Sequence, residues 1–209
     1  MRPAQVITEL IDGPAGALEV AHLPAAHRDS SRGIALIAHP LPTMGGTMDN
    51  KVAVTLAKTF HQLGYATMRF NFRGVGRSAG AFDEGIGETD DAEAALNHLA
   101  RTYPGGQLIL AGFSFGTYVQ TRLWKRIHAQ RNVDRMVLAG PAVNRFKVDP
   151  VPDDTIVVHG EEDDVVPLAA VLEWARPQHL PLIVFPGCGH YFHGRLTQLQ
   201  RMITGMWRT

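Results

Sequence analysis

The chain has 209 residues, enough to bury one large core and short for two, so we expect a single domain over residues 1–209. Lys and Arg together number 20, as do Asp and Glu, so the net charge gives no reason to expect nucleic acid or an anionic membrane as a partner. The single cysteine, Cys188, excludes an internal disulfide. Neither a signal peptide nor an apolar run of the roughly 20 residues that a membrane span needs is apparent. We therefore expect a cytoplasmic protein.

The first part of the chain is typical of strands. Two short apolar runs, residues 6–11 and 17–21, are separated by Asp-Gly-Pro-Ala-Gly, which predicts an opening hairpin. Residues 34–38 are continuously apolar, as expected of a strand that is buried on both faces of a parallel sheet.

From residue 50 onward, helical and strand patterns alternate. Apolar residues at helical spacing predict helices over 50–63, 89–100, 117–130, 168–175 and 196–206. Apolar runs between them predict strands over 66–72, 108–111, 136–139, 155–158 and 182–185. The alternation predicts an α/β fold: a doubly wound, mostly parallel sheet of about eight strands with helices on both faces. Functional residues in such sheets gather at the carboxyl ends of the strands.

The pentapeptide Gly112-Phe113-Ser114-Phe115-Gly116 lies between a predicted strand and a predicted helix. This is the pattern of a nucleophile elbow, a sharp turn that holds the serine hydroxyl clear of the sheet. Glycine two residues to either side lets the backbone pass that closely. We therefore expect Ser114 to be a nucleophile.

A serine nucleophile needs a base, and the base needs a group that holds its tautomer. After the strand at 155–158, the loop contains four acids: Glu161, Glu162, Asp163 and Asp164. After the strand at 182–185 comes His190, with His193 three residues later. His190 is the better candidate, because it lies directly at the strand end whereas His193 leads toward the closing helix. The order serine, acid, histidine is that of α/β-hydrolase triads.

Four segments together resemble the α/β-hydrolase superfamily: His-Pro-x-Pro at 39–42, Asn-Lys-Val at 50–52, Arg-Phe-Asn-Phe-Arg-Gly-x-Gly-x-Ser at 69–78, and the elbow. The chain looks closest to the small, lidless hydrolases related to dienelactone hydrolases, and the resemblance runs from residue 34 to the closing helix. It implies Ser114 as nucleophile, His190 as general base and then acid, and Asp163 as the orienting carboxylate.

The oxyanion hole requires two backbone N–H groups. One is expected from Phe115, directly after the nucleophile, and the other from the loop after residues 34–38. Pro40 and Pro42 have no N–H to donate, which leaves Leu41. Gly45 or Gly46 is the alternative donor.

Residues 140–154 are too few for a helical cap, so we expect an open site that is lined by Leu41, Phe113, Phe115 and Tyr191, with Val143 or Phe146 as further candidates. An open site favours small or extended acyl groups over long buried chains. The hypothesis is a serine carboxylesterase that acts on small-molecule, short-chain esters through an acyl-enzyme and needs no metal or organic cofactor. The same triad would serve a thioesterase, a lactone hydrolase or a peptidase, and a non-catalytic ligand-binding protein is the alternative outside enzymes.

Two further patterns favour structural roles. Residues 72–79 contain G-x-G-x-x-A, the outline of a dinucleotide fingerprint, but a loop is expected to follow until a helix begins near Thr89. His39 and His159 follow strands, and we expect them to brace their loops by hydrogen bonds rather than to act in catalysis. Cys188 is expected to pack beside the histidine loop.

Overall fold

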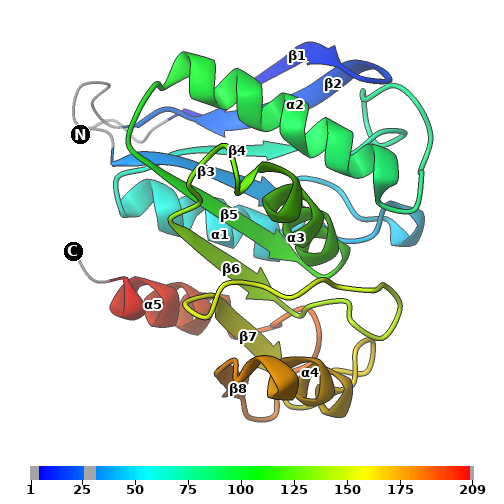
Figure 1. The fold of residues 1–209 in the computed structure, drawn as a ribbon, viewed down its shortest axis with the longest axis vertical. Helices are drawn as coiled ribbons and strands as arrows, with labels where there is room; N and C mark the ends of the chain where they lie inside the picture. Colours follow the sequence, from blue (N-terminus) through cyan, green and yellow to red (C-terminus); the bar gives the residue numbers. More distant parts are fainter. Residues whose placement is uncertain (1–4, 26–31, 208–209) are drawn as a thin grey trace.

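The computed structural model describes residues 5–25 and 32–207. Eight strands form one sheet in the order β1-β2-β4-β3-β5-β6-β7-β8 (Figure 1). β1 and β2 form the predicted hairpin, β2 is also antiparallel to β4, and every other neighbouring pair is parallel. The strands are β1 (Ile7–Gly13), β2 (Gly16–Leu23), β3 (Gly33–Ala38), β4 (Ala66–Phe70), β5 (Gln107–Phe113), β6 (Arg135–Ala139), β7 (Ile156–Gly160) and β8 (Leu182–Phe185).

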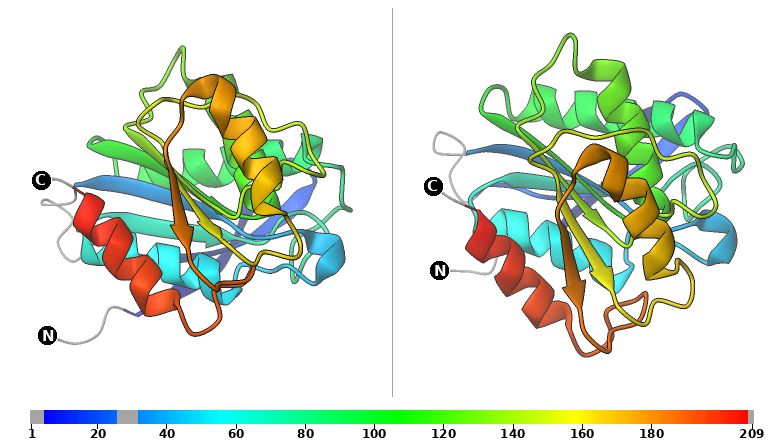
Figure 2. Two further views of the ribbon diagram at one scale, coloured as in Figure 1. Left: turned by 90° about the horizontal axis from the view of Figure 1, so that it is seen from below. Right: turned by 60° about the horizontal axis from the view of Figure 1, so that its bottom comes forward.

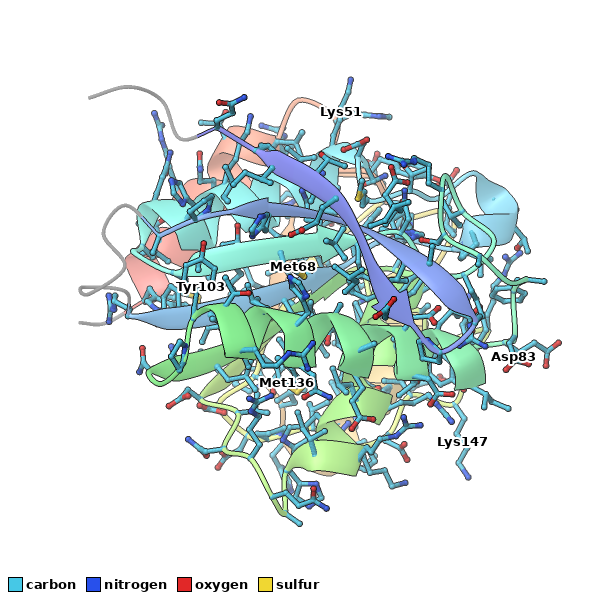
Figure 3. The ribbon with its side chains drawn as sticks, turned by 90° about the horizontal axis from the view of Figure 1, so that it is seen from above. Lys51, Met68, Asp83, Tyr103, Met136 and Lys147 are labelled. Atoms are coloured by element: carbon cyan, nitrogen blue, oxygen red, sulfur yellow. The ribbon has the colours of Figure 1, made fainter. Side chains whose placement is uncertain are left out.

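Helices cover both faces of this sheet, as predicted (Figure 2). α1 (Lys51–Gln62) and α5 (Leu196–Met206) lie on one face, and α2 (Ile86–Thr102), α3 (Phe115–Ile127) and α4 (Leu168–Ala175) lie on the other. Figure 3 shows the β1–β2 hairpin at the edge of the sheet, beside α2. Among the described residues, no helix combines the length and the apolar character that crossing a membrane requires.

The central strands are apolar on both faces because each face packs against helices. In β3, Leu36 belongs to the core beneath α2 and α3, whereas the next residue, Ile37, belongs to the core beneath α1 and α5. Both side chains are fully buried. This two-sided packing explains why the strand shows a continuous apolar run instead of alternation.

Two helices begin earlier than predicted. α2 begins at Ile86 instead of near Thr89, because the Glu88 carboxylate accepts hydrogen bonds from the amides of Asp83 (2.8 Å) and Gly85 (2.7 Å) and so caps an additional turn. α3 begins at Phe115, directly after the serine of the elbow. The G-x-G-x-x-A segment still lies outside any helix, which removes the context of a dinucleotide site.

The segment from Arg69 to Ser78 forms a buried polar network. The Arg73 guanidinium makes two hydrogen bonds to the Asp91 carboxylate, at 2.9 and 3.1 Å. Asn71 accepts a hydrogen bond from the amide of Met48 at 2.8 Å and donates one to Glu19 at 2.8 Å. These bonds connect the loop after β4 to α2, to β2 and, through Met48, to the loop before α1, which borders the site described next.

Candidate active site

Ser114 stands at the junction of β5 and α3 in a backbone conformation that L-residues seldom adopt, with φ 54° and ψ −121°. The flanking glycines make this turn possible. A Cβ on Gly112 would lie 2.5 Å from the carbonyl oxygen of Gly116, and a Cβ on Gly116 would lie 2.3 Å from that of Ala38. Such strain at a single residue is typical of functional sites.

Ser114, His190 and Asp163 are joined by hydrogen bonds. His190 Nε2 lies 3.0 Å from Ser114 Oγ, and His190 Nδ1 lies 2.6 Å from Asp163 Oδ2. All three residues are buried. Because an ionised carboxylate can only accept, Nδ1 of the neutral imidazole carries the hydrogen and Nε2 is free to accept the serine proton. The structure thus brings together the three side chains that the sequence singled out.

The loop after β7 holds Asp163 firmly. Its Oδ1 accepts hydrogen bonds from the amides of Val165 (3.0 Å) and Val166 (2.7 Å). Burial raises the pKa of Asp163, but the hydrogen bonds from His190 and from the Val166 amide outweigh it, so the pKa lies below its ordinary value. Asp163 therefore remains ionised beside the imidazole.

The other three acids of this loop lie elsewhere. Glu161 accepts a hydrogen bond from the amide of Gly187 at 2.8 Å, and Glu162 is exposed. Asp164 is exposed and lines the cavity in front of Ser114. None of the three is hydrogen-bonded to His190, within the part of the chain that the structure describes.

His39 and His159 brace their loops, as expected. His159 Nε2–H donates to the carbonyl of Val166 at 2.8 Å, and burial lowers the pKa of His159. His39 Nε2 accepts a hydrogen bond from the amide of Phe72 at 3.1 Å, and its Nδ1–H donates to the carbonyl of Pro40 at 2.6 Å. Burial lowers the pKa of His39 to about 3, so this imidazole is neutral.

Of the residues in the loop after β3 that line the cavity, Leu41 alone has a backbone N–H group without a backbone acceptor. The two alternative donors are engaged within the loop: the amide of Gly45 donates to Pro42 and that of Gly46 to Leu41, each at 3.0 Å. Among the described residues, the amides of Leu41 and Phe115 donate to no backbone group. Both residues line the cavity that contains Ser114 and His190.

That cavity has a volume of about 300 Å³. No helix or strand lies between β6 and β7, so no cap covers it. Leu41, Phe115, Tyr191 and Phe146 line it as expected, but Val143 does not. The sequence did not identify Met44 and Arg145 as cavity residues, because they lie in loops that carry no periodic pattern, and it indicated Asp164 only as a candidate acid of its loop. The cavity is lined by Pro40, Leu41, Met44, Gly45, Gly46, Asn50, Ser114, Phe115, Ala142, Arg145, Phe146, Asp164, Val165, Val166, His190 and Tyr191.

The prediction that Phe113 lines the substrate cavity is wrong. Alternation along β5 directs its side chain into the core beneath α1 and α5, where it is fully buried. Its ring centroid lies 4.9 Å from that of His190, so Phe113 supports the imidazole rather than contacting a bound molecule. Cys188 packs in the same core, and burial raises the pKa of its thiol.

The family described as serine aminopeptidase, S33, matches residues 30–153, more than half of the chain. The chain belongs to this family of α/β serine hydrolases.

Solved structures resemble this hydrolase over nearly its whole length. A lidless α/β serine hydrolase from Xanthomonas campestris is 35% identical, with a TM-score of 0.87 and coverage of 99% of this chain and 95% of that one. An α/β serine hydrolase homologue from Coxiella burnetii is also 35% identical, with a TM-score of 0.86 and 97% of each chain covered. An uncharacterized protein of Rickettsia prowazekii is 31% identical over 206 residues, which is 92% of the hydrolase and 84% of the relative.

Proposed function

We propose that this hydrolase is a carboxylesterase that cleaves short-chain or small acyl esters through an acyl-enzyme. Ser114 is the nucleophile, His190 the general base and then the general acid, and Asp163 the carboxylate that orients His190. The observation that carries the proposal is the continuous chain of hydrogen bonds from Asp163 through His190 to Ser114, which ends at an open cavity.

In the proposed reaction, Ser114 Oγ attacks the ester carbonyl while its proton passes to His190 Nε2. The amides of Leu41 and Phe115 stabilise the oxyanion that forms, a role for which their lack of a backbone acceptor suits them. Collapse of the tetrahedral intermediate breaks the ester C–O bond as His190 gives its proton to the departing alcohol. A water molecule, deprotonated by His190, then attacks the acyl-enzyme and releases the acid.

The cavity supports small substrates. Its volume of about 300 Å³ suits a small acyl group, and no helix or strand between β6 and β7 adds a wall for a long chain. Leu41, Met44, Phe146 and Val165 give it an apolar wall. Every step above is supplied by side chains and amides of the chain, so the proposal includes no cofactor.

The single free cysteine supports a cytoplasmic location.

The same machinery serves any acyl transfer, so a thioesterase, a lactone hydrolase or a peptidase is the alternative. The family description, serine aminopeptidase, is the specific reason to include aminoacyl amides among the candidates. A non-catalytic protein that only binds ligand in the cavity is the alternative from another class.

A substrate panel tests the proposal. The wild-type protein and Ser114→Ala are assayed with 4-nitrophenyl acetate, butyrate and dodecanoate, a matched thioester, a lactone and an aminoacyl 4-nitroanilide. The proposal predicts the highest kcat/KM on the short esters and its loss in Ser114→Ala by about three orders of magnitude or more. Higher activity on the anilide or the thioester would replace the esterase assignment. No turnover of any substrate would favour the ligand-binding alternative.

A further inference from the structure

A second cavity adjoins the one in front of Ser114. It has a volume of about 280 Å³ and shares three wall residues, Gly45, Asn50 and Tyr191, with the first cavity. The remaining walls come from the loop before α1, the first turn of α1 and His193. Two cavities with a shared wall suit a substrate with two parts, one on each side of the scissile bond.

Tyr191 is the aromatic part of the shared wall. Its ring is stacked on that of His193, with centroids 5.8 Å apart and planes 23° from parallel. On its inner side it meets His190 edge-on at 5.1 Å and Phe113 at 6.0 Å. The ring is therefore supported by three neighbours although the residue is 41% exposed.

The proposed mechanism assigns the two parts of the substrate to the two cavities. The departing alcohol must lie beside His190, since that imidazole gives it a proton. His190 lines the first cavity, Tyr191 lines both and His193 lines only the second, so an alcohol beside His190 can extend past Tyr191 into the second cavity. The apolar side chains of Phe146 and Val165 line only the first cavity. The acyl group thus occupies the first cavity and the alcohol extends into the second.

The second cavity is polar and its unpaired charge is positive. Asp49 lines it, but the Asp49 carboxylate forms an ion pair with the buried Arg69 guanidinium at 2.9 Å. Lys51 also lines it, at the start of α1 and at the edge of the molecule in Figure 3. Among the described residues, no carboxylate pairs with the Lys51 ammonium group. The hydroxyl of Thr47 and the side-chain NH2 group of Asn50 add hydrogen-bond donors.

We propose that the second cavity is a leaving-group site for alcohols that bear a carboxylate, with Lys51 as the residue that pairs with the anion. The preferred substrates are then esters of hydroxy acids. One unpaired lysine together with neutral donors suits a monoanion. This inference rests on the proposed esterase function, because it assigns the cavity by the position of the departing alcohol.

The test compares two esters that differ in one charge, 4-acetoxy-3-nitrobenzoate and its methyl ester. The value of kcat/KM for each is divided by its rate of spontaneous hydrolysis by hydroxide, which removes the difference in leaving-group reactivity. The wild-type protein should prefer the carboxylate, and Lys51→Gln should lower the ratio of charged to neutral ester about three- to fivefold, as expected for one solvent-exposed ion pair. The preference should also weaken in high salt.

Lys58→Gln is the matched control, since Lys58 is an exposed lysine of the same helix that lines neither cavity and its loss changes the net charge equally. This variant should keep the wild-type ratio. Hydrolysis of both esters with an equal ratio in the three proteins would overturn the leaving-group site and leave the esterase proposal standing. Hydrolysis of neither ester by the wild-type protein would overturn the esterase proposal, and the leaving-group site with it.

Discussion

His190 Nδ1 lies 2.6 Å from Asp163 Oδ2, and the other oxygen of the same carboxylate accepts two backbone amides. Asp163 therefore fixes both the position of the imidazole and the nitrogen that carries its hydrogen.

Asp163→Asn tests that role. The asparagine Oδ1 can still accept the two loop amides, but its NH2 group would face Nδ1 and favour the tautomer with the hydrogen on Nε2, which cannot accept the serine proton. Under the proposed mechanism, kcat falls about 10³- to 10⁴-fold. Steady-state kinetics with 4-nitrophenyl acetate gives the value. The control is Glu162→Gln, an exposed acid of the same loop, which should stay close to wild type. Equal kcat in wild type and Asp163→Asn would contradict the role.

The elbow should not tolerate a methyl group at Gly116. In Gly116→Ala, the new Cβ would lie 2.3 Å from the carbonyl oxygen of Ala38, so the packed β3–α3 contact must shift. The free energy of unfolding is expected to fall by about 2 kcal/mol. Gly205→Ala in α5 is the control, because nothing lies within 4 Å of its Cβ and alanine favours a helix. Urea denaturation measures both, and equal stability of the two variants would refute the steric argument.

The two neighbouring aspartates of α2 should differ in their contribution to stability. Asp91 is buried and accepts three hydrogen bonds from Arg73, two from its guanidinium and one from its backbone amide, whereas Asp90 pairs with Arg126 at the surface. Asp91→Asn leaves the largely buried Arg73 guanidinium with only the more distant and more exposed Asp83 carboxylate, at 4.0 Å, so the free energy of unfolding should fall by about 3 kcal/mol. Asp90→Asn should cost about 1 kcal/mol or less. Chemical denaturation of both variants measures the two losses. A loss in Asp90→Asn that equals or exceeds the loss in Asp91→Asn would contradict the prediction.

Buried neutral histidines should make the protein lose stability in mild acid. The pKa of His39 is about 3 in the folded state, against 6.5 for an unburied histidine. Between these two pH values the imidazole is protonated in the unfolded chain and neutral in the folded chain. The free energy of unfolding therefore decreases as the pH falls from 6.5 toward 3, by about 1 kcal/mol per pH unit from this residue. Burial also lowers the pKa of His22 and His159, which adds to the same trend.

Comparison with His39→Gln isolates this contribution. Glutamine cannot bind a proton in this range, so the variant should show a shallower loss of stability between pH 6 and 4, whatever its stability at neutral pH. Urea unfolding at a series of pH values provides the two slopes. Equal slopes would mean that the His39 imidazole is not held neutral by burial.

The fold and most of the site could be predicted because they depend on local sequence patterns. The strand before Ser114, the glycines around it and the apolar helix after it all pointed to the same turn, and the structure contains that turn. The loops with Asp163 and His190 follow neighbouring parallel strands, so their meeting at one edge of the sheet followed from topology.

The features that the sequence predicted wrongly, or did not predict, depend on side-chain contacts and on the paths of loops. The early start of α2 depends on the Glu88 side chain reaching back to two amides, a contact that apolar periodicity does not report. Phe113 adjoins Ser114 in the sequence but does not line the cavity, because the alternation of β5 directs its side chain into the core. Met44 and Arg145 reach the cavity from irregular loops whose paths depend on tertiary contacts.

The central claim is that Ser114 is an activated nucleophile, and covalent labelling tests it most directly. The intact wild-type protein and Ser114→Ala are treated with an organophosphonate ester and analysed by mass spectrometry with peptide mapping. The claim predicts a single adduct on Ser114 in the wild-type protein and none in the variant. A folded wild-type protein that forms no adduct, or forms it on another residue, would contradict the claim.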